Sequence, residues 1–219
     1  MAIPISDRSE DWLVEGPAGG IEVVIDFPSG AGRAQNAGEV ALIAHPHPLF
    51  GGSLDNKVVQ TVAKTMLELG YVTLRPNFRG VGQSAGAHDE GLGEAEDLLQ
   101  LLEQARARFG AAAPVLCGYS FGAFVQACVA QQVTPRRMVL IGVANGRVAG
   151  GRDYRTPPVP PDTIVIHGEL DETVPLANVF EWARPQDLPV TVVPGADHFF
   201  HRRLHLIRNI IRGNWSDKH

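Results

Sequence analysis

Short apolar runs alternate with longer segments of helical periodicity along most of this chain. The short runs are rich in β-branched residues and are bounded by glycine, proline or polar clusters, which predicts strands. The predicted strands are Trp12–Glu15, Ile21–Phe27, Val40–His45, Tyr71–Arg75, Val115–Gly118, Met138–Val143, Thr163–His167 and Val190–Val193. The longer segments carry apolar residues three or four apart, as one face of a helix does. The predicted helices are Asn56–Leu69, Glu94–Phe109, Phe121–Gln132, Leu176–Ala183 and His201–Arg212.

Strands that alternate with helices build βαβ units, so the pattern predicts an α/β fold with a mostly parallel sheet and helices on both faces. The first two strands are joined by a turn rich in glycine and proline, which predicts an antiparallel hairpin at one edge. The residues between Ala144 and Thr163 are too few, and too rich in glycine and proline, for a helical lid. We therefore expect no lid over the functional edge of the sheet.

The composition, 44% hydrophobic and 20% charged over 219 residues, is ordinary for a globular protein, and we expect one domain over residues 1–219. The formal net charge of −5 provides no basic field for nucleic acid or anionic lipid, so neither is an expected partner. No apolar run approaches the roughly 18 residues that span a bilayer, and we expect a cytoplasmic protein. Cys117 and Cys128 fall in a predicted strand and a predicted helix, which favours reduced thiols. The oligomeric state is left open.

One motif lies between a predicted strand and a predicted helix: Gly118-Tyr119-Ser120-Phe121-Gly122, which has the G-x-S-x-G form. In a sharp strand-to-helix turn, side chains two residues from the serine would collide, and glycine avoids the collision. The start of the helix also brings its positive dipole end near any negative charge that develops at Ser120. The motif predicts a nucleophilic Ser120, and an ordinary turn is the alternative.

A serine hydroxyl needs a neighbouring base to take its proton as it attacks, and histidine suits neutral pH. The candidate is His198, because Pro194–His198 forms a loop after the last predicted strand, where open α/β sheets place their chemistry. The spacing of His198, His201 and His205 also allows a metal site on one helix face, but no cysteine or carboxylate completes it. We predict that His198 is the base.

The acid that orients His198 should follow another strand and should lie between the serine and the histidine in chain order. Asp171 meets both conditions. Glu169 and Glu172 are competing carboxylates, and a turn or a helix cap is the alternative role for Asp171. Asp197 is adjacent to His198 and cannot easily reach the edge of its imidazole, so we interpret it as a turn residue.

Attack on a carbonyl creates a negative oxygen, which two backbone N–H groups usually stabilise. One should belong to Phe121, directly after the candidate nucleophile. The other should come from the loop after the third predicted strand, where Pro46 and Pro48 have no N–H to offer. The remaining N–H donors of this loop are His47, Leu49 and Phe50.

The segment Asn77–Ser84 predicts a second loop at the same edge of the sheet. In this loop, Arg79 is expected to pair with a backbone group or a carboxylate.

Together these motifs resemble the α/β-hydrolase superfamily over almost the whole chain, from Ile21 to Arg212. The resemblance is to the small lidless bacterial esterases and, more distantly, to the dienelactone hydrolases. The segments that carry it are His45-Pro46-His47-Pro48 with Gly51-Gly52, Asn77–Ser84, Gly118–Gly122, His167-Gly168 with Asp171, and Ala196-Asp197-His198.

The resemblance implies an eight-stranded sheet and a serine hydrolase that cleaves a carboxylic ester or thioester of small or medium acyl chain. Ser120, His198 and Asp171 would form its catalytic triad, with a small-molecule ester as substrate and with no cofactor or metal. Alignment with the oxyanion loop of dienelactone hydrolases favours Leu49 as the second donor and leaves His47 open. Those enzymes have a cysteine where this chain has Ser120, so general ester chemistry is expected. A non-catalytic binding module on this fold, or a peptidase or lactonase, is the alternative.

Overall fold

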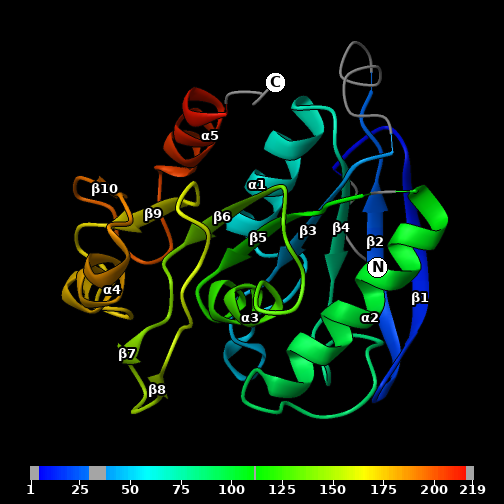
Figure 1. The fold of residues 1–219 in the computed structure, drawn as a ribbon, viewed down its shortest axis with the longest axis horizontal. Coiled ribbons are helices and arrows are strands. Elements are labelled where there is room, and N and C mark those ends of the chain that lie inside the picture. Colours follow the sequence, from blue (N-terminus) through cyan, green and yellow to red (C-terminus); the bar gives the residue numbers. More distant parts are fainter. Residues whose placement is uncertain (1–4, 30–37, 111, 216–219) are drawn as a thin grey trace.

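The computed structural model describes residues 5–29, 38–110 and 112–215. Within them, strands form an 8-stranded sheet in the order β1-β2-β4-β3-β5-β6-β9-β10 (Figure 1). β1 pairs with β2, and β2 with β4, in antiparallel fashion, whereas the other neighbouring strands are parallel. The strands are Ser9–Gly16 (β1), Gly19–Asp26 (β2), Val40–Ala44 (β3), Val72–Pro76 (β4), Val115–Tyr119 (β5), Arg137–Ile141 (β6), Ile164–Gly168 (β9) and Val190–Val193 (β10). The predicted α/β fold with a mostly parallel sheet is confirmed.

Helices cover both faces of this sheet (Figure 1). One apolar core joins α1 and α5 to the strands through residues such as Val58, Met66 and Ile207. A second core on the opposite face includes Leu101 of α2 and Val125 of α3, together with side chains of α4. The α-helices of the described residues are Lys57–Glu68 (α1), Leu92–Phe109 (α2), Phe121–Val129 (α3), Leu176–Ala183 (α4) and Leu204–Asn214 (α5).

Local polar contacts and backbone geometry decide where the helices begin and end. α1 starts after Asn56, whose side chain accepts the Val58 N–H, and Gly70 follows its end with a positive φ of 91°. α2 starts earlier than predicted, at Leu92, because the Glu94 carboxylate accepts the N–H of Gly91 just before the helix. Both capping contacts are local, because each side chain accepts an N–H group only two or three residues away in the sequence.

α5 begins later than the predicted His201. Phe200 and Arg202 have positive φ values of 52° and 60°, which an α-helix does not contain. The helix therefore starts at Leu204, and the preceding residues remain in a loop. The predicted helix Phe121–Gln132 is also shorter, because it ends at Val129.

The segment between β6 and β9 contains a small hairpin in place of a lid helix. Its strands are β7 (Gly146–Arg147) and β8 (Asp153–Tyr154), which pair with each other and not with the main sheet. This arrangement agrees with the predicted absence of a lid. Among the described residues, no helix combines the length and the apolar character that crossing a bilayer requires.

The sheet brings three loops that carry the predicted chemistry to one edge. β5, β9 and β10 run parallel, with β6 between β5 and β9, so their carboxyl ends face the same direction. Ser120 follows β5, Asp171 follows β9, and His198 follows β10. The loop after β3 lies beside them, because β3 is the other neighbour of β5.

Candidate active site

Ser120 lies at a tight turn between β5 and α3. Its φ of 56° falls in the left-handed region, which a residue with a side chain seldom adopts. Its N–H donates to the carbonyl oxygen of Ile141 on β6 at 2.8 Å, which fixes the backbone of the turn to the neighbouring strand. Functional sites commonly retain such strained residues where the surrounding structure holds them.

Glycines on both sides of Ser120 permit this turn, as the sequence predicted. A Cβ at Gly122 would lie 2.4 Å from the carbonyl oxygens of both Ala44 and His45, and a Cβ at Gly118 would lie 2.4 Å from the carbonyl oxygen of Gly122. These neighbours are backbone atoms, which cannot rotate away as the end of a side chain can. The first turn of α3 therefore packs directly against the end of β3.

The side chains of Ser120, His198 and Asp171 meet in one hydrogen-bonded line. His198 Nε2 is 2.9 Å from Ser120 Oγ, and His198 Nδ1 is 2.6 Å from Asp171 Oδ2. The second carboxylate oxygen, Oδ1, accepts the backbone N–H groups of Thr173 at 2.9 Å and Val174 at 2.7 Å. The carboxylate is thus fixed at both oxygens. Because a carboxylate only accepts hydrogen bonds, its bond to His198 requires that Nδ1 carry the proton. The structure brings together the three residues that the sequence singled out.

Two further side chains, Tyr119 and His167, contact His198 and Asp171. The Tyr119 hydroxyl donates to the carbonyl oxygen of His198 at 2.9 Å, and the two rings pack with centroids 5.2 Å apart. His167 Nε2 donates to the carbonyl oxygen of Val174 at 3.0 Å and also lies 3.4 Å from Asp171 Oδ2. Burial lowers the pKa of His167, so its ring is neutral beside the carboxylate. The sequence analysis did not assign this role to His167. The available signal was its place at the end of a predicted strand.

The competing carboxylates face other partners. Glu169 Oε2 accepts the N–H of Gly195 at 2.7 Å, and Glu172 is exposed. Asp197 pairs with His201, whose Nδ1 lies 2.5 Å from Asp197 Oδ2. Because His198 lies in the loop before α5 and His201 pairs with Asp197, the histidines do not share a helix face as a metal site would require.

The loop after β3 forms a 3-10 turn at Pro48–Phe50 that determines which N–H groups are free. The N–H of Leu49 donates to His47 Nδ1 at 3.2 Å, and the N–H of Phe50 donates to the carbonyl oxygen of His47 at 3.2 Å. By contrast, the N–H groups of His47 and Phe121 donate to none of the described residues. The N–H of Leu49, the expected second donor, is therefore already engaged within the turn.

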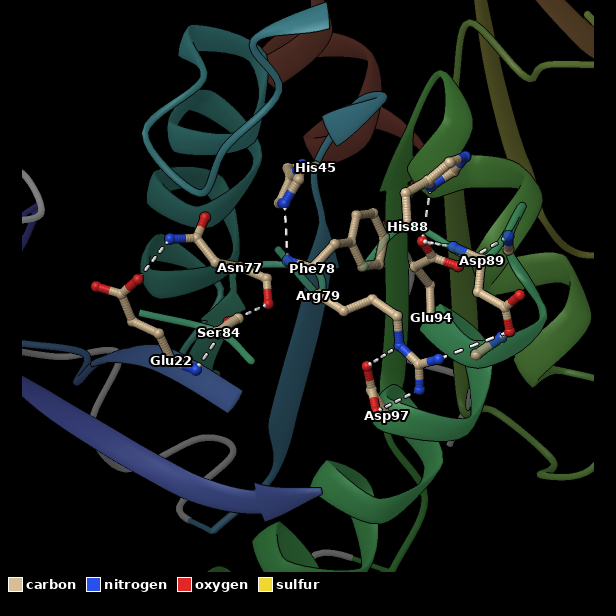
Figure 2. Close-up of polar contacts among 12 residues, drawn as sticks. Glu22, His45, Asn77, Phe78, Arg79, Ser84, His88, Asp89, Glu94 and Asp97 are labelled. Atoms are coloured by element: carbon tan, nitrogen blue, oxygen red, sulfur yellow. Dashed lines mark hydrogen bonds and ion pairs between the residues drawn. The ribbon is translucent and has the colours of Figure 1, made fainter. Parts of the chain in front are cut away.

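A second loop supports the first from below (Figure 2). His45 Nε2 accepts the N–H of Phe78 at 2.9 Å, and His45 Nδ1 donates to the carbonyl oxygen of Pro46 at 2.6 Å. Burial lowers the pKa of His45 to about 4, which agrees with a neutral ring that both donates and accepts. Arg79 in this loop forms two hydrogen bonds to Asp97, at 2.8 and 2.9 Å. Arg79 is therefore the structural partner of a carboxylate, as expected.

His88 and Glu94 reach the loop after β3 from the start of α2 (Figure 2). The Glu94 carboxylate is fully buried and lies 2.8 Å from His88 Nδ1. The His88 ring packs against His47 with centroids 4.6 Å apart, and His47 also contacts Phe121 at 4.9 Å. The pKa of His47 is lowered to about 4, first by burial and then by nearby His88 and Arg152. No sequence motif indicated this brace.

Ser120 and His198 line a cavity of about 270 Å³. Its apolar walls and its few polar groups resemble a small-molecule site more than a protein interface. Cys117 lies beneath it, fully buried, and burial raises the pKa of its thiol, so it is a core residue and no competing nucleophile. The residues that line the cavity are Pro46, His47, Phe50, Gly51, Gly52, Asn56, Tyr119, Ser120, Ala149, Gly150, Arg152, Thr173, His198 and Phe199.

Comparison with known proteins identifies the class of protein to which this fold and this site belong. Residues 47–144 match the family model described as alpha/beta hydrolase fold. A lidless a/b serine hydrolase from Xanthomonas campestris is 33% identical, with 98% of this chain and 95% of that chain covered and a TM-score of 0.84. An alpha-beta serine hydrolase homologue from Coxiella burnetii is 37% identical, with 94% and 97% covered and a TM-score of 0.79.

An uncharacterized protein from Rickettsia prowazekii is similar as well, with 32% identity over 180 residues, 74% of this chain and 71% of that protein. The chain therefore belongs to the α/β-hydrolase family. It is a hydrolase, and the solved structures that it resembles above 30% identity are described as serine hydrolases. The resemblance to lidless bacterial members that the motifs suggested is confirmed.

The glycine turn yields a first prediction. Gly122→Ala should lower the free energy of unfolding by about 1–3 kcal/mol, because its Cβ overlaps the carbonyl oxygens at the end of β3. The matched control is Gly213→Ala, since nothing lies within 4 Å of the added Cβ and alanine favours the helix. Urea unfolding followed by circular dichroism measures both. Equal stability of the two variants would contradict the packing described for α3.

The buried neutral His45 yields a second prediction. Its pKa is about 4 in the folded chain and 6.5 as its ordinary value, so the unfolded chain takes up a proton first as the pH falls. The stabilisation is complete above pH 6.5 and is lost progressively as the pH falls to about 4. When the pH falls from about 7.5 to about 5, protonation of His45 in the unfolded chain should lower the free energy of unfolding by about 2 kcal/mol.

His45→Gln isolates this contribution from those of other buried histidines. Urea unfolding of the wild type and the variant at both pH values gives the pH dependence of each. We expect the variant to be less stable at neutral pH and to lose less stability on acidification. An equal pH dependence in the two proteins would show that His45 does not titrate as its burial requires.

Proposed function

We propose that this chain is a serine hydrolase that cleaves carboxylic esters of small or medium acyl chain through an acyl-enzyme. The observation that carries the proposal is the hydrogen-bonded line from Asp171 through His198 to Ser120 at the wall of a cavity. A hydroxyl, an imidazole and a carboxylate in that order are the groups that acyl transfer to serine requires. The two serine hydrolases above 30% identity support the same reaction class.

The first half of the reaction forms the acyl-enzyme. Ser120 Oγ attacks the acyl carbon while His198 Nε2 takes its proton across the 2.9 Å contact. Asp171 holds the Nδ1 proton and stabilises the imidazolium that forms, without becoming protonated itself. The tetrahedral intermediate then expels the alcohol, which takes the proton back from His198 Nε2.

The second half releases the acid. A water molecule gives a proton to His198 Nε2 and attacks the ester carbonyl of the acyl-enzyme. The second tetrahedral intermediate breaks its bond to Ser120 Oγ, and the serine recovers its proton from His198. The acid leaves, and the free enzyme is restored with no change in its own atoms.

Each tetrahedral intermediate carries a negative oxygen that needs two N–H donors. We assign these to the backbone N–H groups of Phe121 and His47. The free N–H of His47 and the engaged N–H of Leu49 support this choice. His47 also lines the cavity with Ser120, and the buried ring of His47 keeps the loop in place.

The cavity favours small substrates that carry an ester, although a thioester would follow the same steps. A volume of about 270 Å³ lies just below the usual range for small-molecule sites, roughly 300–1,000 Å³. The segment between β6 and β9 forms the small hairpin β7–β8 and contains no helix. A small-molecule ester is therefore the proposed substrate.

Ser120→Ala tests the nucleophile. The variant should lose at least about 1,000-fold in kcat on p-nitrophenyl acetate and butyrate, because it removes the attacking oxygen. Its melting temperature should stay near that of the wild type, which serves as the control for folding. A fluorophosphonate probe should label the wild type at Ser120 and leave the variant unlabelled.

Two outcomes would refute this assignment. Wild-type turnover by the variant would remove Ser120 from the chemistry. A wild type that neither cleaves these esters nor reacts with the probe would favour a non-catalytic binding module on the same fold.

The oxyanion assignment has a matched pair of variants at one position. His47 has a φ of −54°, which proline can adopt, so His47→Pro removes the N–H without requiring a new backbone angle. His47→Ala removes the same imidazole but keeps the N–H. We expect kcat of His47→Pro to be lower than that of His47→Ala by about 100- to 1,000-fold. Equal kcat values on p-nitrophenyl butyrate would transfer the role to another donor.

A further inference from the structure

Arg152 reaches the same cavity as Ser120 from the small hairpin. It immediately precedes β8 and lines the cavity wall, where it is half-buried. The proposed reaction uses no positive side chain, so Arg152 has no part in the steps above. A charged group in a substrate cavity that the chemistry does not use indicates a role in substrate recognition.

Neighbouring groups fix the guanidinium of Arg152 in one orientation. Its Cζ lies 4.3 Å from the centroid of the Phe50 ring, and its Nε and Nη2 donate to the carbonyl oxygen of Ala149 at 3.2 and 2.6 Å. A guanidinium held in this way loses little further conformational freedom when it binds a ligand.

The charge of Arg152 is not balanced by a carboxylate. Arg75 and Arg79 pair with Asp26 and Asp97 at 3.0 and 2.8 Å, but no carboxylate of the described residues lies within 4.0 Å of Arg152. The described residues that line the cavity include no aspartate or glutamate. A half-buried cation without a counter-ion attracts an anion from solution more strongly than an exposed cation does.

A neighbouring cavity of about 650 Å³ shares Arg152 and Phe50 but differs in charge. Glu90 and Asp153 line it together with Arg155, so charges of both signs are present. An anion gains no clear advantage there. The unbalanced positive charge belongs to the cavity that contains Ser120.

Two exposed phenylalanines complete the recognition surface around the cavity. Phe50 is 67% exposed and Phe199 is 56% exposed, and both line the cavity with Ser120. They provide apolar contact for the body of a substrate, while Arg152 provides one fixed positive group. We infer that the substrate is an ester that also bears a carboxylate, which binds to Arg152. This inference rests on the proposed ester hydrolysis.

Matched substrate pairs test the inference and show which side of the ester carries the anion. For the acyl side, mono(p-nitrophenyl) adipate is compared with neutral p-nitrophenyl hexanoate. For the alcohol side, 4-acetoxybenzoate is compared with its neutral methyl ester. The wild type should prefer the anionic member of at least one pair by about 10- to 100-fold in kcat/KM, mainly through KM.

Arg152→Gln should abolish that preference, so that the ratio of kcat/KM between the anionic and the neutral member of the pair falls to about 1. Arg155→Gln is the matched control, because it removes an equal charge only three residues from Arg152. The Arg155 side chain lines the neighbouring cavity and not the cavity with Ser120. It should retain the preference. No anionic preference in the wild type, or a preference that survives in Arg152→Gln, would overturn the inference while ester hydrolysis still stands.

A binding measurement separates this inference from the proposed reaction. Calorimetric titration of Ser120→Ala with the preferred pair should show the anionic ester binding about 10-fold tighter than the neutral one, and Ser120→Ala combined with Arg152→Gln should show no difference. If the wild type cleaves no ester, both pairs are titrated, and the proposed function has failed. The anion site then stands if an Arg152-dependent difference appears, and it falls if none does.

Discussion

The first turn of α3 packs against the end of β3 so closely that only hydrogen fits between them. The space at Gly122 is closed by the carbonyl oxygens of Ala44 and His45, and the turn before it forces Ser120 into the left-handed region. The positions of Ser120 and of the Phe121 N–H depend on this contact. The contact sets Ser120 Oγ above the sheet and places the N–H of Phe121 beside Ser120. It also brings the loop after β3 close to Ser120.

Neutral imidazoles surround this contact and define its hydrogen bonding. His45 donates from Nδ1 and accepts at Nε2, which joins the loop after β3 to the backbone of Phe78. His47 accepts the Leu49 N–H at Nδ1, and His167 donates from Nε2 to Val174. Burial keeps each ring uncharged, so each has one donor and one acceptor nitrogen with a fixed direction. The loops near Ser120 are thereby held by side chains whose protonation state does not change near neutral pH.

Much of the fold and the positions of Ser120, Asp171 and His198 could be predicted because strand ends and loop motifs are local properties of the sequence. Parallel strands gather their carboxyl ends at one edge, so residues just after three strands had to lie near one another. The expectation for Leu49 took no account of a contact that the sequence does not reveal. Its N–H is taken by the side chain of His47 in a 3-10 turn, and residue spacing does not reveal such a contact.

Other contributions come from contacts between distant segments and carry no sequence signal. The Glu94–His88 pair braces His47 from the start of α2, and Arg152 lies in a stretch rich in glycine where no motif could be recognised. The start of α5 was also placed too early, because the positive φ values at Phe200 and Arg202 are set by the turn after His198. The apolar residues keep a helical spacing through this segment, although its backbone is not helical.

The way Asp171 is held bears on how fast charge can move through the site. Its Oδ1 accepts two backbone N–H groups and its Oδ2 faces His198, so the carboxylate is already oriented before any proton moves. In the proposed reaction, no dipole of this loop has to turn when an imidazolium forms beside the carboxylate. The reorganisation energy of the surrounding protein is therefore small, whereas water around the same pair would have to reorient with every turnover.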